Sequence, residues 1–341
     1  MKKILNVLLA IALVTALSAC GSAKPTQSAT SGAEAPIVIT IAHVEPEGRS
    51  LHQGSVLFKE YVEEKSQGRI QVNILPNGQF GGDREAVEGV ILGSIQMAAA
   101  VSSVLTSYSD DFMILDLPFM FNSREANYRA LDGELGAALN DVLPNYGLVG
   151  LGFNDNGLRQ ITNNVRPVNT PEDLKGVKMR VMESPVFVRM FNLLGANPTP
   201  MSFTEVYTAL QQGTVDGQEN GVGLVYESKF QEVQKYLSLT GHVFSVNAVV
   251  INKDFYEALP EDLRNIIAEG VKSGLVDGQR EIEGSNDDQF IEKLKDAGMT
   301  VNEVSPENLA AFRAAMGPLY EEYREKVRTE LFEMIDRANA G

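Results

Sequence analysis

The chain has 341 residues, 44% of them hydrophobic, which suggests two domains and a sizeable core. It carries 29 Lys and Arg against 45 Asp and Glu, and the net charge of -16 argues against a partner with a nucleic-acid backbone. Its single cysteine excludes an internal disulfide, and its three histidines lack the spacings of metal sites, so we expect no metal.

The N-terminus predicts an exported lipoprotein. Two lysines follow the first Met, and the apolar run at residues 4–17 is too short to span about 30 Å of hydrocarbon, so residues 1–19 are expected to be a signal peptide. The Leu-Ser-Ala-Cys that ends this run resembles the lipobox of bacterial lipoproteins, in which the cysteine, here Cys20, is acylated. The alternative is a simple secretory signal cleaved near Ala19. Residues 20–36, rich in Ser, Ala, Thr and Gly, predict a flexible tether.

The first part of the body predicts a βαβαβ unit. The apolar run at 37–42 is typical of a strand buried on both faces, and an apolar stripe then indicates a helix that ends at Gly68. Strands are expected at 70–74 and 95–101, and between them a helix that Asp83 can cap after two glycines.

The second part continues the alternation of strands and helices. We expect strands at 147–153, 158–165, 177–182 and within 237–251, and helices at 170–176, 184–195, 202–213 and over much of 260–297. A last helical stretch from Ser305 should kink or break at Pro318. The pattern predicts an α/β protein with a parallel or mixed sheet, whose ligands lie beyond the carboxyl ends of the strands.

Motifs of known catalytic or nucleotide-binding sites are missing from the sequence. Two Gly-x-Gly pairs, at 150–152 and 221–223, begin like dinucleotide fingerprints, but Asp155 and Tyr226 occupy the positions of the third glycine. We find no phosphate loop, serine elbow or Cys/His couple. The chain is therefore predicted not to be an enzyme and to need no cofactor.

Two arginines are candidates for binding an anion. Arg180 lies near the carboxyl end of an expected strand, just before a helix that begins at Ser184, where free backbone N–H groups also favour an anion. A guanidinium can donate two parallel hydrogen bonds to a carboxylate. The alternative is a surface salt bridge, and Arg159 presents the same two possibilities.

Several motifs together resemble one family. They are the lipobox, Leu-Pro-Phe at 117–119, Leu-Lys-Gly-Val-Lys-Met-Arg at 174–180, Leu-Gly-Ala-Asn-Pro-Thr-Pro-Met at 194–201, Glu-Val-Tyr-Thr-Ala-Leu-Gln at 205–211 and Val-Asp-Gly-Gln-Glu-Asn at 215–220. In these motifs the chain resembles the solute-binding proteins of TRAP transporters, the tripartite ATP-independent periplasmic systems. The resemblance extends from about Ile37 to the C-terminal helices.

The resemblance implies a two-domain fold like that of periplasmic binding proteins. Two discontinuous α/β lobes would be joined by hinge strands and a long helix, with the ligand cleft between them. We place lobe 1 at residues 37–156 and 246–285, and lobe 2 at residues 157–245 and 286–341.

The resemblance also implies the residues of the site. Arg180 matches the arginine that pairs with the substrate carboxylate, and Arg159 matches a second arginine that supports it. Asn220 matches a polar contact to the same carboxylate, and Phe203 matches an aromatic side chain packed against the ligand. Asp83 matches a position that contacts ligand hydroxyls in sialic-acid members, with helix capping as its alternative role.

The kind of acid is indicated by departures from the family pattern. This chain has Val44 and Val101 where sialic-acid members carry Asn and Glu, which argues against sialic acid. Glu183, three residues after Arg180, could accept hydrogen bonds from ligand hydroxyls and repel a second carboxylate. Its alternative role is a charge at a helix N-terminus. Further candidates for hydroxyl contacts are Glu47, Arg49, His52, Asn154 and Asn247.

The expected function is extracytoplasmic capture of an organic acid, favoured to be a sugar acid such as a hexuronate. The expected partners are the small and large membrane subunits of a permease driven by an ion gradient, and the membrane itself through lipid on Cys20; the protein is expected to be a monomer. The alternatives are a C4-dicarboxylate or sialic-acid receptor, a ligand-binding partner of a signalling receptor, and a secreted enzyme acting on carboxylated sugars.

Overall fold

The computed structural model describes residues 35–341. The predicted signal peptide, Cys20 and nearly all of the predicted tether lie outside the described residues. The described strands are β1 (Ile37–Ala42), β2 (Ile70–Leu75), β3 (Met97–Val101), β4 (Leu148–Asn163), β5 (Lys178–Val181), β6 (Asn197–Pro200), β7 (Gly217–Gly221), β8 (Tyr236–Leu239), β9 (Phe244–Asn252) and β10 (Thr300–Glu303).

The strands of residues 35–341 form one connected mixed sheet in the order β2-β1-β3-β9-β4-β7-β5-β6. The pairs β1–β2, β1–β3, β5–β6 and β5–β7 are parallel, whereas β9 runs antiparallel to β3 and β4, and β7 antiparallel to β4. Strand β8 pairs with β4, and β10 pairs with β8. The expected α/β class with a mixed sheet is confirmed.

Strand β4 crosses the molecule and corrects one expectation. The two strands predicted at 147–153 and 158–165 are one strand of 16 residues. Its first part pairs with β9 from Leu148 to Leu158, and its last part pairs with β7 from Arg159 to Asn163. The polar residues 154–156 between the two predictions are buried strand residues rather than a loop. A register shift near Gly157, at a φ of 93°, allows the strand to continue past this point.

The helices lie between and around these strands. They are α1 (Ser50–Lys65), α2 (Asp83–Ile91), η1 (Ser102–Ser107), η2 (Asp110–Leu115), α3 (Arg124–Asp132), α4 (Glu134–Asn140), η3 (Leu143–Tyr146), η4 (Pro171–Leu174), α5 (Pro185–Leu193), α6 (Phe203–Gln211), α7 (Val222–Glu227), η5 (Phe230–Glu232), α8 (Lys253–Ala258), α9 (Glu261–Gly270), η6 (Val271–Gly278), α10 (Gln279–Gly284), α11 (Asp287–Asp296), α12 (Pro306–Ala315), α13 (Gly317–Arg324) and α14 (Thr329–Ala340). None of the helices described in residues 35–341 has the length and apolar character needed to cross a membrane.

The ends of several helices test the capping predictions. Thr170 forms a capping box with Asp173, and the side chain of Ser184 caps α5 by accepting from the backbone N–H of Val186. Ser202 begins a capping-box pattern in the sequence, but its side chain makes no cap hydrogen bond to α6. The cap by Asp83 is wrong, because Gly82 is the N-cap of α2 and the Asp83 carboxylate accepts a hydrogen bond from the backbone of Val101 instead. The expected break at Pro318 is confirmed, since α12 ends and α13 begins there.

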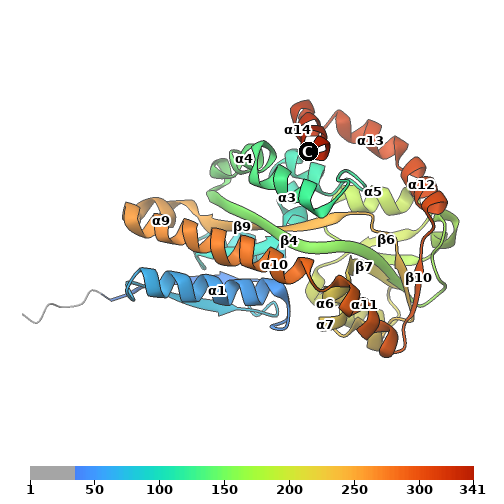
Figure 1. Ribbon diagram of the computed structural model, residues 1–341, viewed down its shortest axis with the longest axis horizontal. Helices are drawn as coiled ribbons and strands as arrows, with labels where there is room; N and C mark the ends of the chain where they lie inside the picture. Colours follow the sequence, from blue (N-terminus) through green and yellow to red (C-terminus); the bar gives the residue numbers. More distant parts are fainter. Residues whose placement is uncertain (1–34) are drawn as a thin grey trace, which may run out of the picture. The chain divides into compact units, whose positions relative to one another are not determined.

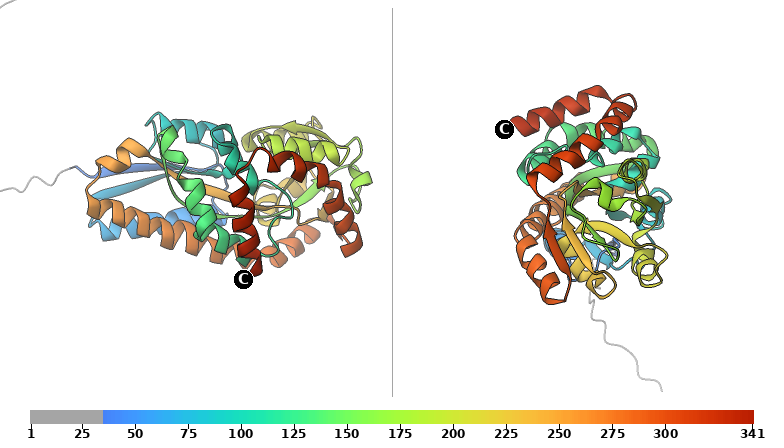
Figure 2. Two further views of the ribbon diagram at one scale, coloured as in Figure 1. Left: turned by 90° about the horizontal axis from the view of Figure 1, so that it is seen from above. Right: turned by 90° about the vertical axis from the view of Figure 1, so that its right-hand side faces the viewer.

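Helices cover both faces of the sheet around β1 and β3. The helix α1 and the continuous helical run α9–η6–α10 lie side by side on one face (Figures 1 and 2). Small residues allow this close approach, because a side chain at Gly274 would meet the backbone of Phe58 in α1. The segment η6 is π-helical, a geometry that often marks functional regions of helices.

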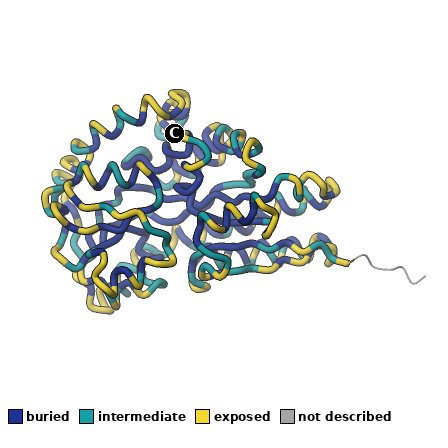
Figure 3. The backbone as a smooth tube through the Cα atoms, turned by 180° about the vertical axis from the view of Figure 1, so that it is seen from behind, coloured by how far each residue is buried: buried dark blue, intermediate teal, exposed yellow. Residues whose placement is uncertain are grey.

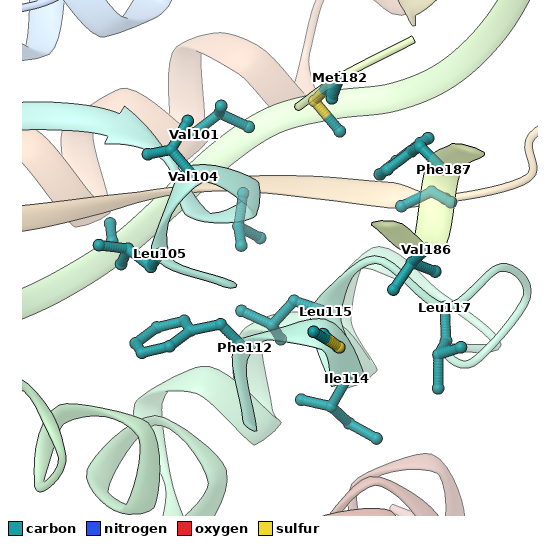
Figure 4. Packing of buried hydrophobic residues seen from close by; sticks show 14 of the residues in the cluster. Val101, Val104, Leu105, Phe112, Ile114, Leu115, Leu117, Met182, Val186 and Phe187 are labelled. Atoms are coloured by element: carbon teal, nitrogen blue, oxygen red, sulfur yellow. The ribbon is translucent and has the colours of Figure 1, made fainter. Parts of the chain in front are cut away.

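Apolar side chains fill the space between the layers. One buried cluster joins β1, β2, β3 and β9 to α1 and α9, and a second joins α2, η1 and η2 to α5 and the C-terminal helices. Figure 3 shows that the central strands are buried, whereas exposed residues follow the outer sides of the helices. In Figure 4, side chains of β3, η1, η2 and α5 lie around one interior together with Met182, which follows β5.

Candidate functional site

A pocket lies where strands from both parts of the sheet end. It is lined by Val44, Glu45, Leu51, Asp83, Val101, Asn156, Arg180, Met182, Phe203, Asn220, Leu224 and Asn247. The lining includes the carboxyl ends of β3, β5 and β7, and the residues that follow β1. This is the place where ligands bind in open α/β sheets. Four of the six predicted ligand-binding residues meet here, namely Arg180, Asn220, Phe203 and Asp83.

Arg180 is a buried cation that no carboxylate in the described part of the chain neutralises by direct contact. Its side chain donates from Nε and Nη2 to the backbone oxygen of Met201, at 3.0 and 2.8 Å. No carboxylate of residues 35–341 lies within ion-pair distance of it. Burial is the main cause that lowers the pKa of Arg180 to about 10; the cation Arg159 acts in the same direction, whereas Glu219, Asp83 and Glu183 oppose the shift. A carboxylate entering the pocket would relieve this unfavourable desolvation.

Asp83 stands beside Arg180 without bonding to it. One of its carboxylate oxygens accepts a hydrogen bond from the backbone of Val101 at 3.3 Å. Burial is the main cause that raises the pKa of Asp83 to about 7; repulsion from Glu45 and Glu183 acts in the same direction, whereas the hydrogen bond from Val101 and the charge of Arg180 oppose it. Its carboxyl group can therefore accept or donate a hydrogen bond near neutral pH.

Asn220 and Phe203 complete the part of the pocket that the sequence predicted. The amide of Asn220 is buried at the end of β7 and donates to Gln218 at 2.5 Å, a contact that orients its oxygen. Phe203 begins α6, and its ring centroid lies 5.9 Å from that of Phe230. These two side chains add one polar and one aromatic surface to the pocket.

Arg159 lies outside the pocket lining. It is completely buried and forms an ion pair with Glu219, whose backbone oxygen it also contacts. His242 bonds the same carboxylate at 3.2 Å. Burial alone would raise the pKa of Glu219, but Arg159 and His242 outweigh burial and lower it. Arg159 is thus held by protein groups next to the pocket.

Glu183 also lies outside the pocket lining. It pairs with Arg84 of α2 at 3.3 Å, and both side chains are partly exposed. Arg84 donates in turn to Ser107 at 2.9 Å. The ion pair joins the segment after β5 to α2, so it connects the two groups of strands around the pocket.

Three polar residues of the pocket were absent from the main sequence prediction. Glu45 and Asn156 were not proposed at all, and Asn247 was only one of several further candidates. Of the other candidates for hydroxyl contacts, Glu47 is exposed and His52 contacts His43 at 3.3 Å. Arg49 bonds to the pocket residue Glu45, and Asn154 bonds to the pocket residue Asn247. Burial of Glu45 depends on partners distant in the sequence, which no local pattern signals.

The chain matches a known family over most of its length. Residues 41–326 match the sequence profile described as bacterial extracellular solute-binding protein, family 7. The C4-dicarboxylate-binding periplasmic protein DctP of Rhodobacter capsulatus is 34% identical over 307 residues, 89% of this chain and 92% of that protein. The 2,3-diketo-L-gulonate-binding periplasmic protein YiaO of Escherichia coli is 35% identical over 269 residues, 79% of this chain and 81% of that protein.

Solved structures agree with these matches. The sugar acid binding protein DctPAm from Advenella mimigardefordensis, in complex with galactonate, has a TM-score of 0.87 and 32% identity. The similarity covers 89% of this chain and 98% of that one. The similarity therefore includes both groups of strands and the pocket between them.

Proposed function

The chain belongs to family 7 of the bacterial extracellular solute-binding proteins, the receptor subunits of TRAP transporters, and on this premise we propose that its ligand is a polyhydroxylated monocarboxylate such as a hexuronate or aldonate. The family is extracytoplasmic, and its fold is the two-lobed α/β fold with a ligand cleft. The proposal concerns the ligand and the residues that hold it.

The observation that carries this proposal is the state of Arg180. A buried guanidinium without a carboxylate partner in the described chain is a receptor for the carboxylate of a ligand. We propose that Arg180 pairs with the ligand carboxylate, that Asn220 contacts the same end, and that Phe203 packs on the carbon chain. Asp83 would contact ligand hydroxyls.

Arg159 and Glu183 would act on the ligand through other side chains. Arg159 would support the site by fixing Glu219 beside Arg180 through their ion pair, rather than by adding a free positive charge. Glu183 would help to hold the lobes together through Arg84. The boundaries of lobe 1 at residues 37–156 and 246–285, and of lobe 2 at residues 157–245 and 286–341, stay a prediction.

The lining of the pocket favours a sugar acid over two other ligands. Val44 and Val101 are apolar where sialic-acid members carry polar side chains, and both line the pocket. The acidic Asp83 suits hydroxyl donors better than a second carboxylate. A C4-dicarboxylate is the second candidate, because the relative from Rhodobacter capsulatus is named for that ligand.

The cellular setting forms a further part of the proposal. We propose that lipid on Cys20 attaches the protein to the membrane and that the receptor works as a monomer. It would deliver its ligand to the small and large membrane subunits of a TRAP permease. We propose no chemical reaction, so the ligand should be recovered unaltered after long incubation with the protein.

A thermal-shift screen tests the ligand class. Uronates and aldonates should raise the melting temperature more than dicarboxylates, sialic acid or 2-oxo acids do. A response confined to dicarboxylates would contradict the proposal.

Two variants test the role of Arg180. Arg180→Ala should lose about 2–5 kcal/mol of binding free energy, and Arg180→Lys should recover only part of it, because lysine keeps the charge but cannot form the bidentate contact. Unchanged affinity in Arg180→Ala, measured by calorimetry, would remove Arg180 from the site.

A further inference from the structure

The pocket contains a second acidic side chain in the loop between β1 and α1. Glu45 follows β1, lines the pocket, and is only 2% exposed. Its sequence surroundings, Glu-Pro-Glu-Gly-Arg, are typical of an exposed loop. A buried carboxylate in such a segment needs specific partners.

Those partners hold both oxygens of Glu45. Arg49 donates from Nε to one oxygen at 3.0 Å, and Asn247 donates to the other at 3.4 Å. Arg49 also donates to Glu283 of α10 at 3.0 Å, and Ser50 donates to Glu283 at 2.5 Å. The position of Glu45 is therefore fixed from the side of the helices, while the side chain still lines the pocket.

The charges of this group do not balance. Two carboxylates, Glu45 and Glu283, share one guanidinium, Arg49, so the fully ionised group has one net negative charge. Burial raises the pKa of Glu45, and Glu283 raises it further, against the attraction of Arg49. A hydrogen-bond donor from the ligand would stabilise the ionised carboxylate, whereas another anion nearby would destabilise it.

A neighbouring amide and a second carboxyl group offer further acceptors to a ligand. The side-chain oxygen of Asn156 is buried in the pocket wall and has no hydrogen-bond partner within residues 35–341. Asp83 interacts electrostatically with both Glu45 and Arg180. The pocket thus combines one cation with several oxygen acceptors, a pattern that suits one carboxylate and several hydroxyl groups.

We infer that Glu45 is a specificity residue: its carboxylate accepts hydrogen bonds from ligand hydroxyls and disfavours any ligand with a second carboxylate. This inference rests on the proposed function, because it concerns the end of the ligand that Arg180 does not bind. It gives the proposed preference for sugar acids over dicarboxylates one responsible side chain.

Calorimetric titration with D-galactonate and succinate tests the inference. In Glu45→Gln the galactonate Kd should rise about tenfold or more, since a hydrogen bond to a charged acceptor is lost. The succinate Kd should fall, because the repelling charge is removed. Glu47→Gln is the matched control: the same substitution two residues away, at an exposed position, should change neither Kd.

A second variant covers the case in which Glu45→Gln does not fold. Glu45→Asp keeps the charge but shortens the side chain, so it should weaken galactonate binding and still reject succinate. Suppose that the wild-type protein prefers galactonate and that both variants keep the wild-type ratio of the two Kd values. This result would overturn the role of Glu45 and leave the proposed ligand class standing. A wild-type preference for succinate would overturn the proposed ligand class, and the role of Glu45 with it.

Discussion

The two buried arginines beside the pocket have opposite surroundings. Arg159 on β4 and Arg180 on β5 are separated by β7 and are 0% and 3% exposed. Arg159 is bonded to the carboxylate and the backbone of Glu219. Arg180 bonds only the backbone oxygen of Met201 among the described groups.

The carboxyl groups near the two arginines also differ, in the direction in which their pKa is shifted. The pKa of Glu219 is lowered, because Arg159 and His242 outweigh the effect of burial. The pKa of Asp83 is raised to about 7 by burial, since it lies near Arg180 but is not bonded to it. Burial alone therefore does not identify a binding arginine: the informative property is whether the protein itself supplies the counter-ion.

The largest expected effect concerns stability. Arg159→Ala would leave Glu219 as a buried carboxylate without its guanidinium and should lower the free energy of unfolding by about 3–5 kcal/mol. Arg180→Ala, which removes a desolvated cation and breaks no ion pair, should change it by less than about 1 kcal/mol. Urea denaturation of both ligand-free variants measures the difference. Equal losses would contradict the distinction between the two sites.

The next effect is a pH dependence caused by Asp83. Its pKa in the folded protein, about 7, lies above the ordinary 3.8, so the folded state binds more protons between these values and stability falls as the pH rises through this range. In Asp83→Asn this contribution to the pH dependence of the free energy of unfolding, at most about 1.4 kcal/mol per pH unit, should disappear. Denaturation of both proteins from pH 4 to 7 measures it. Parallel curves would show that Asp83 titrates normally.

The smallest effect should come from the ion pair of Glu183 and Arg84. Partly exposed ion pairs contribute about 0–1 kcal/mol, so Glu183→Gln should alter galactonate affinity by only a few fold. Arg84→Gln should change the galactonate affinity by the same amount. The variant with both substitutions should bind galactonate little more weakly than either single variant. A loss of about a hundredfold in Glu183→Gln alone would instead indicate direct contact with the ligand.

Much of the architecture could be predicted from the sequence, because apolar periodicity and capping residues are local signals. The motifs around Arg180 and Asn220 located part of the pocket through the family resemblance. Two features could not be predicted. The polar run 154–156 resembles a loop, and its burial within β4 depends on hydrogen bonds to β9 and to Gln279. Glu45 is buried among partners that include Asn247 and an arginine, Arg49, that also bonds to Glu283, and both Asn247 and Glu283 are more than 200 residues further along the chain.

The shared strand β4 limits how ligand preference can be exchanged between related receptors. One group of strands needs β1, β2, β3, β9 and the first part of β4, and the other needs the last part of β4 with β5, β6 and β7. The second group is continuous in the chain, over residues 159–221, whereas the first group joins residues 37–101 to the first part of β4 and to β9. Grafting residues 37–101 from a relative would transplant β1, β2 and β3 without β9, which pairs with both β3 and β4. Protein engineers should exchange individual pocket side chains instead.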